Sequence, residues 1–98
     1  MAVVFSKSVK MGNYIAHMKI RSVPASDNRP DGFKVNFVLI NMETQQAVLL
    51  VDNHKPFGYH LHPTPDKDHH DRIELIVNSP FEALEIFLTK ARAITHEE

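Results

Sequence analysis

The 98-residue sequence contains no cysteine and no tryptophan, only three glycines, and no long run of apolar residues. Without cysteine the chain forms neither a disulfide framework nor a thiolate metal site, and this composition suits a reducing compartment. Three glycines are too few for a glycine-rich phosphate loop. No apolar stretch approaches the ~20 residues that span a bilayer, and the apolar stretch among the first residues is too short for a signal peptide. We therefore expect a cytoplasmic protein with no membrane partner.

What is present indicates one globular domain over residues 1–98. The sequence is 43% hydrophobic and 23% charged, which is typical of a chain that buries one core. Charge is distributed unevenly, because residues 1–41 carry six basic and two acidic groups, whereas residues 42–98 carry five basic and ten acidic groups. The formal net charge is −1. A local basic face can therefore still bind phosphate, although the whole chain is nearly neutral.

Alternation of apolar and polar residues predicts strands over residues 14–23, 33–40 and 46–51, and shorter ones over 58–62 and 72–77. The first dozen residues have a weak pattern and predict no element. Short, turn-rich connections between successive strands favour antiparallel neighbours.

A capping box predicts where the C-terminal helix begins. Ser79 is followed three residues later by Glu82, and Pro80 occupies the first helical position, where its missing N–H has no cost. An apolar stripe at helical spacing then follows, formed by Phe81, Leu84, Phe87, Leu88, Ala91 and Ile94. The predicted fold is α+β: an antiparallel meander of four to five strands with one C-terminal amphipathic helix packed on one face. The other face carries His17, Lys19, Arg21, Lys34 and Asn36, and we expect function there.

Five of the seven histidines fall between residues 54 and 70. One interpretation is metal binding, because His60 and His62 are two apart on a strand and project from the same face. His54, or one residue of the segment 69–71 (His69, His70, Asp71), would complete such a site. Two ligands alone do not make a site, so we assign no metal and no other cofactor.

A second interpretation is acid–base catalysis. A histidine pair can remove one proton and donate another near neutral pH, as metal-free RNA cleavage requires. Lys19, Arg21 or Lys55 would then neutralise the phosphate, and Asp52 would orient a histidine. The third interpretation is an ordinary solvated loop, which suits His69 and His70 best.

The run Val51-Asp52-Asn53-His54-Lys55-Pro56-Phe57-Gly58-Tyr59-His60-Leu61-His62, followed by a short strand and an amphipathic helix, resembles the TumE-like toxin family of bacterial toxin–antitoxin systems. In that family an Asp-Asn pair at a strand end precedes histidines in a short loop and strand. Here Asp52 and Asn53 match the pair, and His54, His60 and His62 match the histidines. The resemblance covers residues 46–94 and implies a toxin encoded beside a helix-turn-helix antitoxin.

Together these observations predict a toxin-like protein that acts on RNA, with His54, His60, His62, Asp52 and Asn53 as catalytic residues. The enzyme class to test is a metal-independent ribonuclease. Phosphate contacts are assigned to Lys19, Arg21 and Lys55. The alternatives are a non-catalytic module that binds a helix-turn-helix regulator and a histidine-based metal-binding domain. A homodimer is left open.

Overall fold

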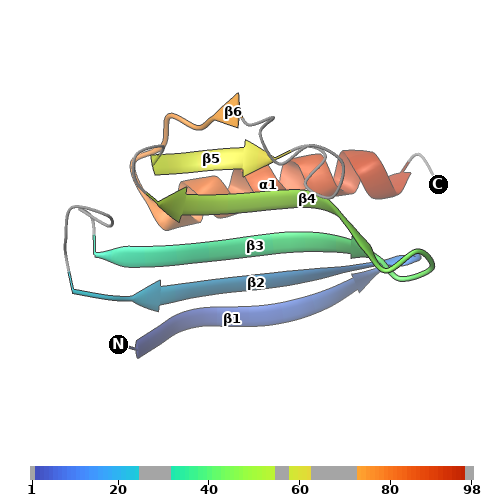
Figure 1. Ribbon diagram of the computed structural model, residues 1–98, viewed down its shortest axis with the longest axis horizontal. Helices are drawn as coiled ribbons and strands as arrows, with labels where there is room; N and C mark the ends of the chain where they lie inside the picture. The colour runs from blue at the N-terminus through green and yellow to red at the C-terminus, as the bar shows by residue number, and fades with distance from the viewer. Residues whose placement is uncertain (1, 25–31, 55–57, 63–72, 97–98) are drawn as a thin grey trace.

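The computed structural model describes residues 2–24, 32–54, 58–62 and 73–96. They form a six-stranded antiparallel sheet whose strands lie in chain order, followed by one helix (Figure 1). The elements are β1 (Ala2–Met11), β2 (Tyr14–Ser22), β3 (Phe33–Asn41), β4 (Gln46–His54), β5 (Gly58–His62), β6 (Ile73–Glu74) and α1 (Pro80–His96). The predicted combination of a meander sheet and one C-terminal helix is confirmed.

The strand count is six, so the prediction of four to five was wrong, because it left out β1. This strand pairs with β2 along its whole length. Its pattern is weak for two reasons. The register shifts between Val3 and Phe5, which interrupts the alternation, and Lys7 lies on the same side of the strand as Phe5 and Val9. An edge strand with one side only partly buried leaves little signal in the sequence.

Two further strands differ in length from their predictions. β4 continues through His54 instead of ending at Val51, because Asp52 pairs with His60 and His54 pairs with Gly58. The predicted strand over 72–77 is reduced to Ile73–Glu74 in the described residues. Of the connection between β2 and β3, only Val23, Pro24 and Gly32 lie within the described residues.

The helix begins where the capping box predicts. The backbone N–H of Glu82 donates to Ser79 Oγ at 3.2 Å. The carboxylate of Glu82 accepts from the backbone N–H of Asn78, one residue before the position that a full capping box would use. The helix N-terminus is therefore capped from both directions.

The core lies between α1 and one face of the sheet. Phe37 on β3 packs against Phe87 on α1, with ring centroids 5.6 Å apart. The buried apolar residues are Tyr14, Ala16, Met18, Ile20, Val35, Phe37, Leu39, Leu49, Val51, Leu61, Ala83, Phe87 and Ala91. Phe81, predicted in the buried stripe, is 48% exposed. Phe87 and Ala91 of the predicted stripe are buried together with Pro80 and Ala83, and Leu84, Leu88 and Ile94 pack partly buried against the core, so the buried stripe is rotated by only about an eighth of a turn.

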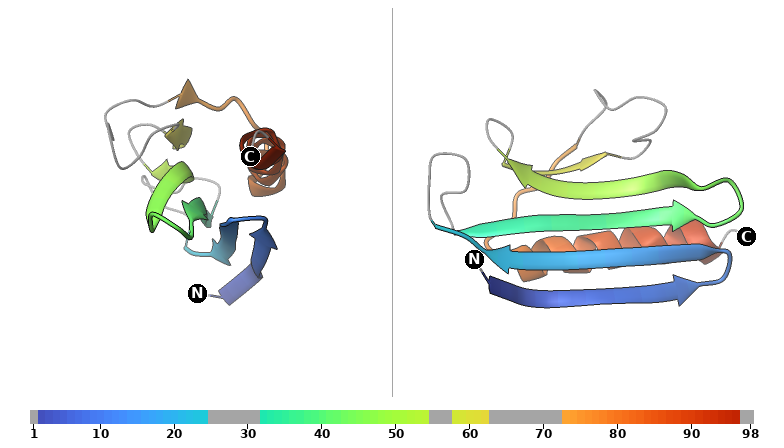
Figure 2. Two further views of the ribbon diagram at one scale, coloured as in Figure 1. Left: turned by 90° about the vertical axis from the view of Figure 1, so that its right-hand side faces the viewer. Right: turned by 60° about the horizontal axis from the view of Figure 1, so that its bottom comes forward.

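The helix covers only one face of the twisted sheet, where it contacts β2, β3 and β4 (Figure 2). Residues that alternate with the core positions therefore project from the opposite side. We call this side the open face. On β2 and β3 it carries polar and charged residues, as the sequence predicted.

Candidate functional site

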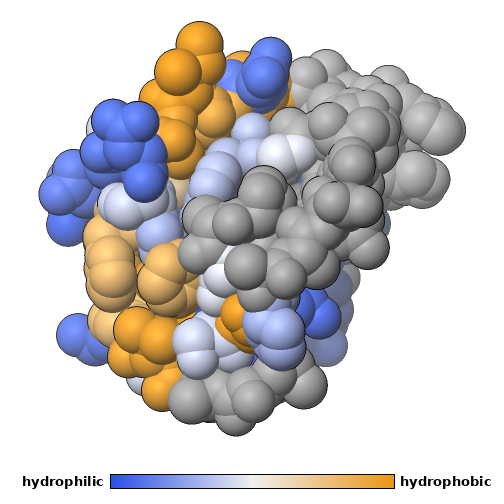
Figure 3. All heavy atoms as spheres, turned by 90° about the vertical axis from the view of Figure 1, so that its left-hand side faces the viewer, coloured by the Kyte–Doolittle hydropathy of each residue, from blue (hydrophilic) through white to orange (hydrophobic). Residues whose placement is uncertain are grey.

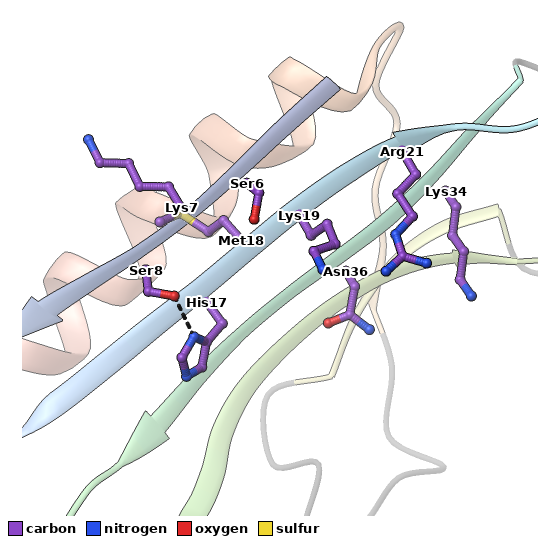
Figure 4. A pocket seen from close by; sticks show the side chains of 9 residues that line it. All are labelled: Ser6, Lys7, Ser8, His17, Met18, Lys19, Arg21, Lys34 and Asn36. Carbon is purple, nitrogen blue, oxygen red and sulfur yellow. Dashed lines mark hydrogen bonds between the residues drawn. The ribbon is translucent and has the colours of Figure 1, made fainter. Parts of the chain in front are cut away.

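A groove lies on the open face over β1, β2 and β3 (Figure 4). Its volume is about 400 Å³, which is within the range of small-molecule sites. Its lining residues are Ser6, Lys7, Ser8, His17, Met18, Lys19, Arg21, Lys34 and Asn36. Lys7 and Met18 are paired in the register and lie on the helix side, and the other seven residues project from the open face.

Strand alternation explains why these side chains gather there. His17, Lys19 and Arg21 are alternate residues of β2, so they stand in one line about 6.6 Å apart at the backbone. Lys34 lies directly opposite Arg21, and Asn36 lies directly opposite Lys19. The pairing of β2 with β3 therefore brings residues more than a dozen positions apart onto one surface.

The groove is cationic. None of the described residues that line it is acidic, whereas four of them are lysine or arginine. The opposed pair Arg21 and Lys34 places like charges at neighbouring positions, which destabilises a sheet slightly. A bound anion would convert this repulsion into attraction, so the arrangement favours phosphate or another anion at this place.

A serine–histidine contact lies at one end of the groove. Ser8 Oγ and His17 Nδ1 are 2.7 Å apart, on neighbouring strands, and both side chains are exposed (Figure 4). The contact engages one nitrogen of the imidazole and restrains the ring. Nε2 therefore stays available to a ligand on the open face.

Two of the three predicted phosphate contacts, Lys19 and Arg21, meet in the groove. The third, Lys55, lies outside the described residues. Sequence reasoning placed Lys34 on the open face but did not assign it to the site, and it missed Ser8 entirely. The position of Lys34 follows once Arg21 is known to be its partner in the register. Ser8 lies on the strand that the sequence did not predict.

The histidines of β5 are adjacent but buried. The imidazoles of His60 and His62 meet edge to face with ring centroids 4.8 Å apart, as expected for residues two apart on a strand. They are only 1% and 8% exposed. The predicted catalytic role requires contact with substrate, and in this structure neither ring is open to solvent. β5 is buried on both faces at these positions, since Leu61 between them is buried as well.

The ring of His60 is held by a hydrogen bond to the backbone of its own strand. Its Nδ1 lies 2.7 Å from the backbone carbonyl oxygen of Gly58. Because a carbonyl oxygen only accepts hydrogen bonds, Nδ1 carries a proton and donates it here. In the neutral ring the lone pair is then on Nε2. This interaction assigns the tautomer of the buried imidazole.

Asn53 clamps two strands together. Its Oδ1 accepts from the backbone N–H of Val35 at 2.8 Å, and its Nδ2 donates to the carbonyl oxygen of Phe33 at 2.8 Å. The side chain, 4% exposed, thus supplies the hydrogen bonds that β4 would otherwise give to the start of β3. The geometry gives Asn53 a structural role. Asp52 Oδ1 accepts from the backbone N–H of Asn53 at 2.7 Å.

One row of paired residues on the open face connects the groove with His60. Residues paired across the sheet share a face, and one such row runs Ser6, Lys19, Asn36, Asp52, His60 and Glu74. Every member is polar. Three strand spacings, about 14 Å, separate the backbone of Lys19 from that of His60. The predicted phosphate and histidine groups are therefore aligned but do not meet.

The metal interpretation gains no support from the described residues. Among them, no group of three or more histidine, aspartate or glutamate side chains is arranged to hold a metal ion. The backbone of His54 pairs with Gly58, but its side chain lies outside the description, as do His69, His70 and Asp71. In the same part of the chain, α1 is too short and too polar to cross a membrane, and it is the one helix there.

In the comparisons with known proteins, no family model, no curated protein and no solved structure matches the chain.

Proposed function

We propose that this protein is the toxin-like component of a bacterial toxin–antitoxin pair and that it acts on RNA bound at the groove of the open face. The observation that carries the proposal is the convergence of Lys19, Arg21 and Lys34 on one surface with no acidic residue among its described lining. The resemblance of residues 46–94 to TumE-like toxins supplies the toxin role.

The donor set suits a phosphodiester backbone. Lysine and arginine provide charge-assisted hydrogen bonds to phosphate oxygens, and Asn36, Ser6 and Ser8 add neutral polar groups. No phenylalanine or tyrosine is among the described lining residues, so base stacking in the groove is confined to the His17 ring and the Arg21 guanidinium. Binding should therefore follow the backbone and depend little on base sequence.

RNA cleavage by His60 and His62 is a separate part of the proposal. One histidine would take the proton of the 2′-hydroxyl, whose oxygen attacks the adjacent phosphorus. The other would protonate the departing 5′-oxygen, leaving a 2′,3′-cyclic phosphate and a free 5′-hydroxyl. Because both rings are buried, the β5 region would have to open before substrate could reach them.

Binding is tested by fluorescence anisotropy with a labelled single-stranded RNA. The double variant K19A/R21A should bind on the order of 100-fold more weakly, because each lost charged hydrogen bond contributes roughly 1.5–3 kcal/mol. The matched control is K90A/R92A, which removes one lysine and one arginine from exposed positions on α1. Equal losses in the two variants, or no loss in the first, would refute the groove as the binding site.

Cleavage is tested separately with H60A/H62A, by incubation with RNA and by expression in bacteria. If the histidines are catalytic, the variant neither cleaves RNA nor inhibits growth. A folded variant that inhibits growth as strongly as the native protein would make the catalytic assignment wrong. Circular dichroism establishes that the variant is folded.

A non-catalytic protein-binding module is the second candidate, and exposed apolar residues favour it. Ile76 is 97% exposed, and Ile73 and Phe81 are 50% and 48% exposed. In the chain, Ile76 and Phe81 flank the start of α1, and the end of the molecule where α1 begins shows hydrophobic surface in Figure 3. If this patch binds a helix-turn-helix antitoxin, I76D should abolish co-purification of the two proteins and leave RNA binding unchanged.

A further inference from the structure

The side chains on β2 form a straight line along which an extended nucleic-acid strand can lie. His17, Lys19 and Arg21 follow one another along the open face, with Lys34 beside Arg21 at one end and Ser8 beside His17 at the other (Figure 4). Their spacing, about 6.6 Å at the backbone, is comparable to that of successive phosphates in an extended single strand. The groove continues along the whole line.

His17 differs from the other members of the line because it carries a charge only when protonated. The open-face neighbours of His17 are Ile15 and Lys19 on β2, Ser6, Ser8 and Lys10 on β1, and Asn36, Val38 and Ile40 on β3. The charged ones, Lys10 and Lys19, are both cationic. A phosphate bound over the ring adds an attraction that only the protonated imidazole has.

Ser8 prepares the ring for such a contact. In the protonated imidazole both nitrogens donate, so Nδ1 donates to Ser8 Oγ, which lies 2.7 Å away. Nε2 then carries a proton as well and can donate to a phosphate oxygen. The serine hydroxyl only has to rotate its own hydrogen. No other rearrangement is required.

From this geometry we infer that single-stranded RNA lies along β2, with successive phosphates at Arg21 and Lys34, at Lys19 and at His17, and that His17 binds its phosphate only as the imidazolium. The inference rests on the proposed function and adds the path of the strand and a fourth, proton-dependent contact. RNA affinity should therefore rise as the pH falls, with about one proton taken up per bound strand.

The test combines salt and pH. In single-stranded nucleic acid, each phosphate contact contributes about −0.7 to the slope of log affinity against log salt concentration. At about pH 8 the two phosphates held by permanent cations predict a slope of about −1.4, and at about pH 5.5 the third phosphate, at His17, makes it about −2.1. Anisotropy titrations with the labelled RNA, at several salt concentrations and both pH values, measure the two slopes.

Three variants identify the histidine responsible. H17Q keeps a polar side chain that cannot take up a proton, so its slope should be the same at about pH 5.5 as at about pH 8. S8A should reduce the steepening of the slope between about pH 8 and about pH 5.5. H96Q, which alters an exposed histidine at the end of α1, should retain the native response.

The possible failures are distinguishable. If the native protein binds RNA at neither pH, or if K19A/R21A binds as tightly as the native protein, the proposed function fails and this inference fails with it. If K19A/R21A weakens binding but H17Q retains the native pH response, only the assignment of His17 is overturned.

Discussion

The open face of the sheet has two halves that differ in how far their polar side chains are exposed to solvent. Over β1 to β3, lysine, arginine and histidine side chains stand exposed or half-exposed around a groove. Over β5, two imidazoles are packed edge to face and nearly excluded from water. Both halves lie on the same side of one sheet and share a row of paired residues. Residue type alone therefore does not identify the ligand-binding surface, because accessibility decides which half can meet a ligand without a change of structure.

The largest effect should come from reversing charge in the exposed half. K19E/R21E should weaken RNA binding on the order of 1000-fold, because two favourable contacts become repulsive. H60Q/H62Q, which alters the buried half, should bind RNA within a few-fold of the native protein. Anisotropy titration measures both variants. Comparable losses in the two would mean that both halves form one binding surface.

Asn53 links the two halves, and its loss should be the most destabilising of the single changes considered. N53A leaves the backbone N–H of Val35 and the carbonyl of Phe33 without their side-chain partner, at a cost of roughly 2–4 kcal/mol in the free energy of unfolding. N36A, at an exposed position on β3, should change it by less than about 0.5 kcal/mol. Urea denaturation provides both values. A small effect of N53A would contradict the structural role given to this side chain.

Removing a buried histidine ring should lower the free energy of unfolding more than removing an exposed one. H60A removes a buried ring from contact with His62 and should cost about 2 kcal/mol. H17A removes an exposed ring and should cost less than about 0.5 kcal/mol. Thermal and urea unfolding of the two variants test the contrast. If H17A is the more destabilising change, the description of His17 as exposed and of His60 as buried is wrong.

The smallest effect concerns the opposed cations of the groove. K34E places a carboxylate opposite Arg21 and should stabilise the fold by about 0.5 kcal/mol, since an opposite-charge pair replaces a like-charge pair. The same change should weaken RNA binding by roughly tenfold. Urea denaturation and anisotropy measure the two effects. A variant that is less stable and binds RNA normally would contradict the account of the Arg21–Lys34 pair.

Several elements could be predicted because their pattern is local. The helix start follows from Ser79 and Glu82, and the open-face position of Lys19 and Arg21 follows from the strict alternation of β2. β1 could not be predicted, because a register shift and Lys7 on the helix side disturb its alternation. The structural role of Asn53 was equally hidden, since its partners, Phe33 and Val35, lie about twenty residues earlier.

The sequence by itself determined which residues of β2 and β3 face the helix and which face away, because the two-residue period of a strand appears directly in the order of their apolar residues. Only the tertiary structure decided that Arg21 would stand opposite Lys34, that Ser8 would reach His17, and that the imidazoles of His60 and His62 would be buried. These facts depend on strand register and on what packs over each strand. The register and this packing are set by contacts between residues distant in the chain, and a local sequence pattern contains no information on such contacts.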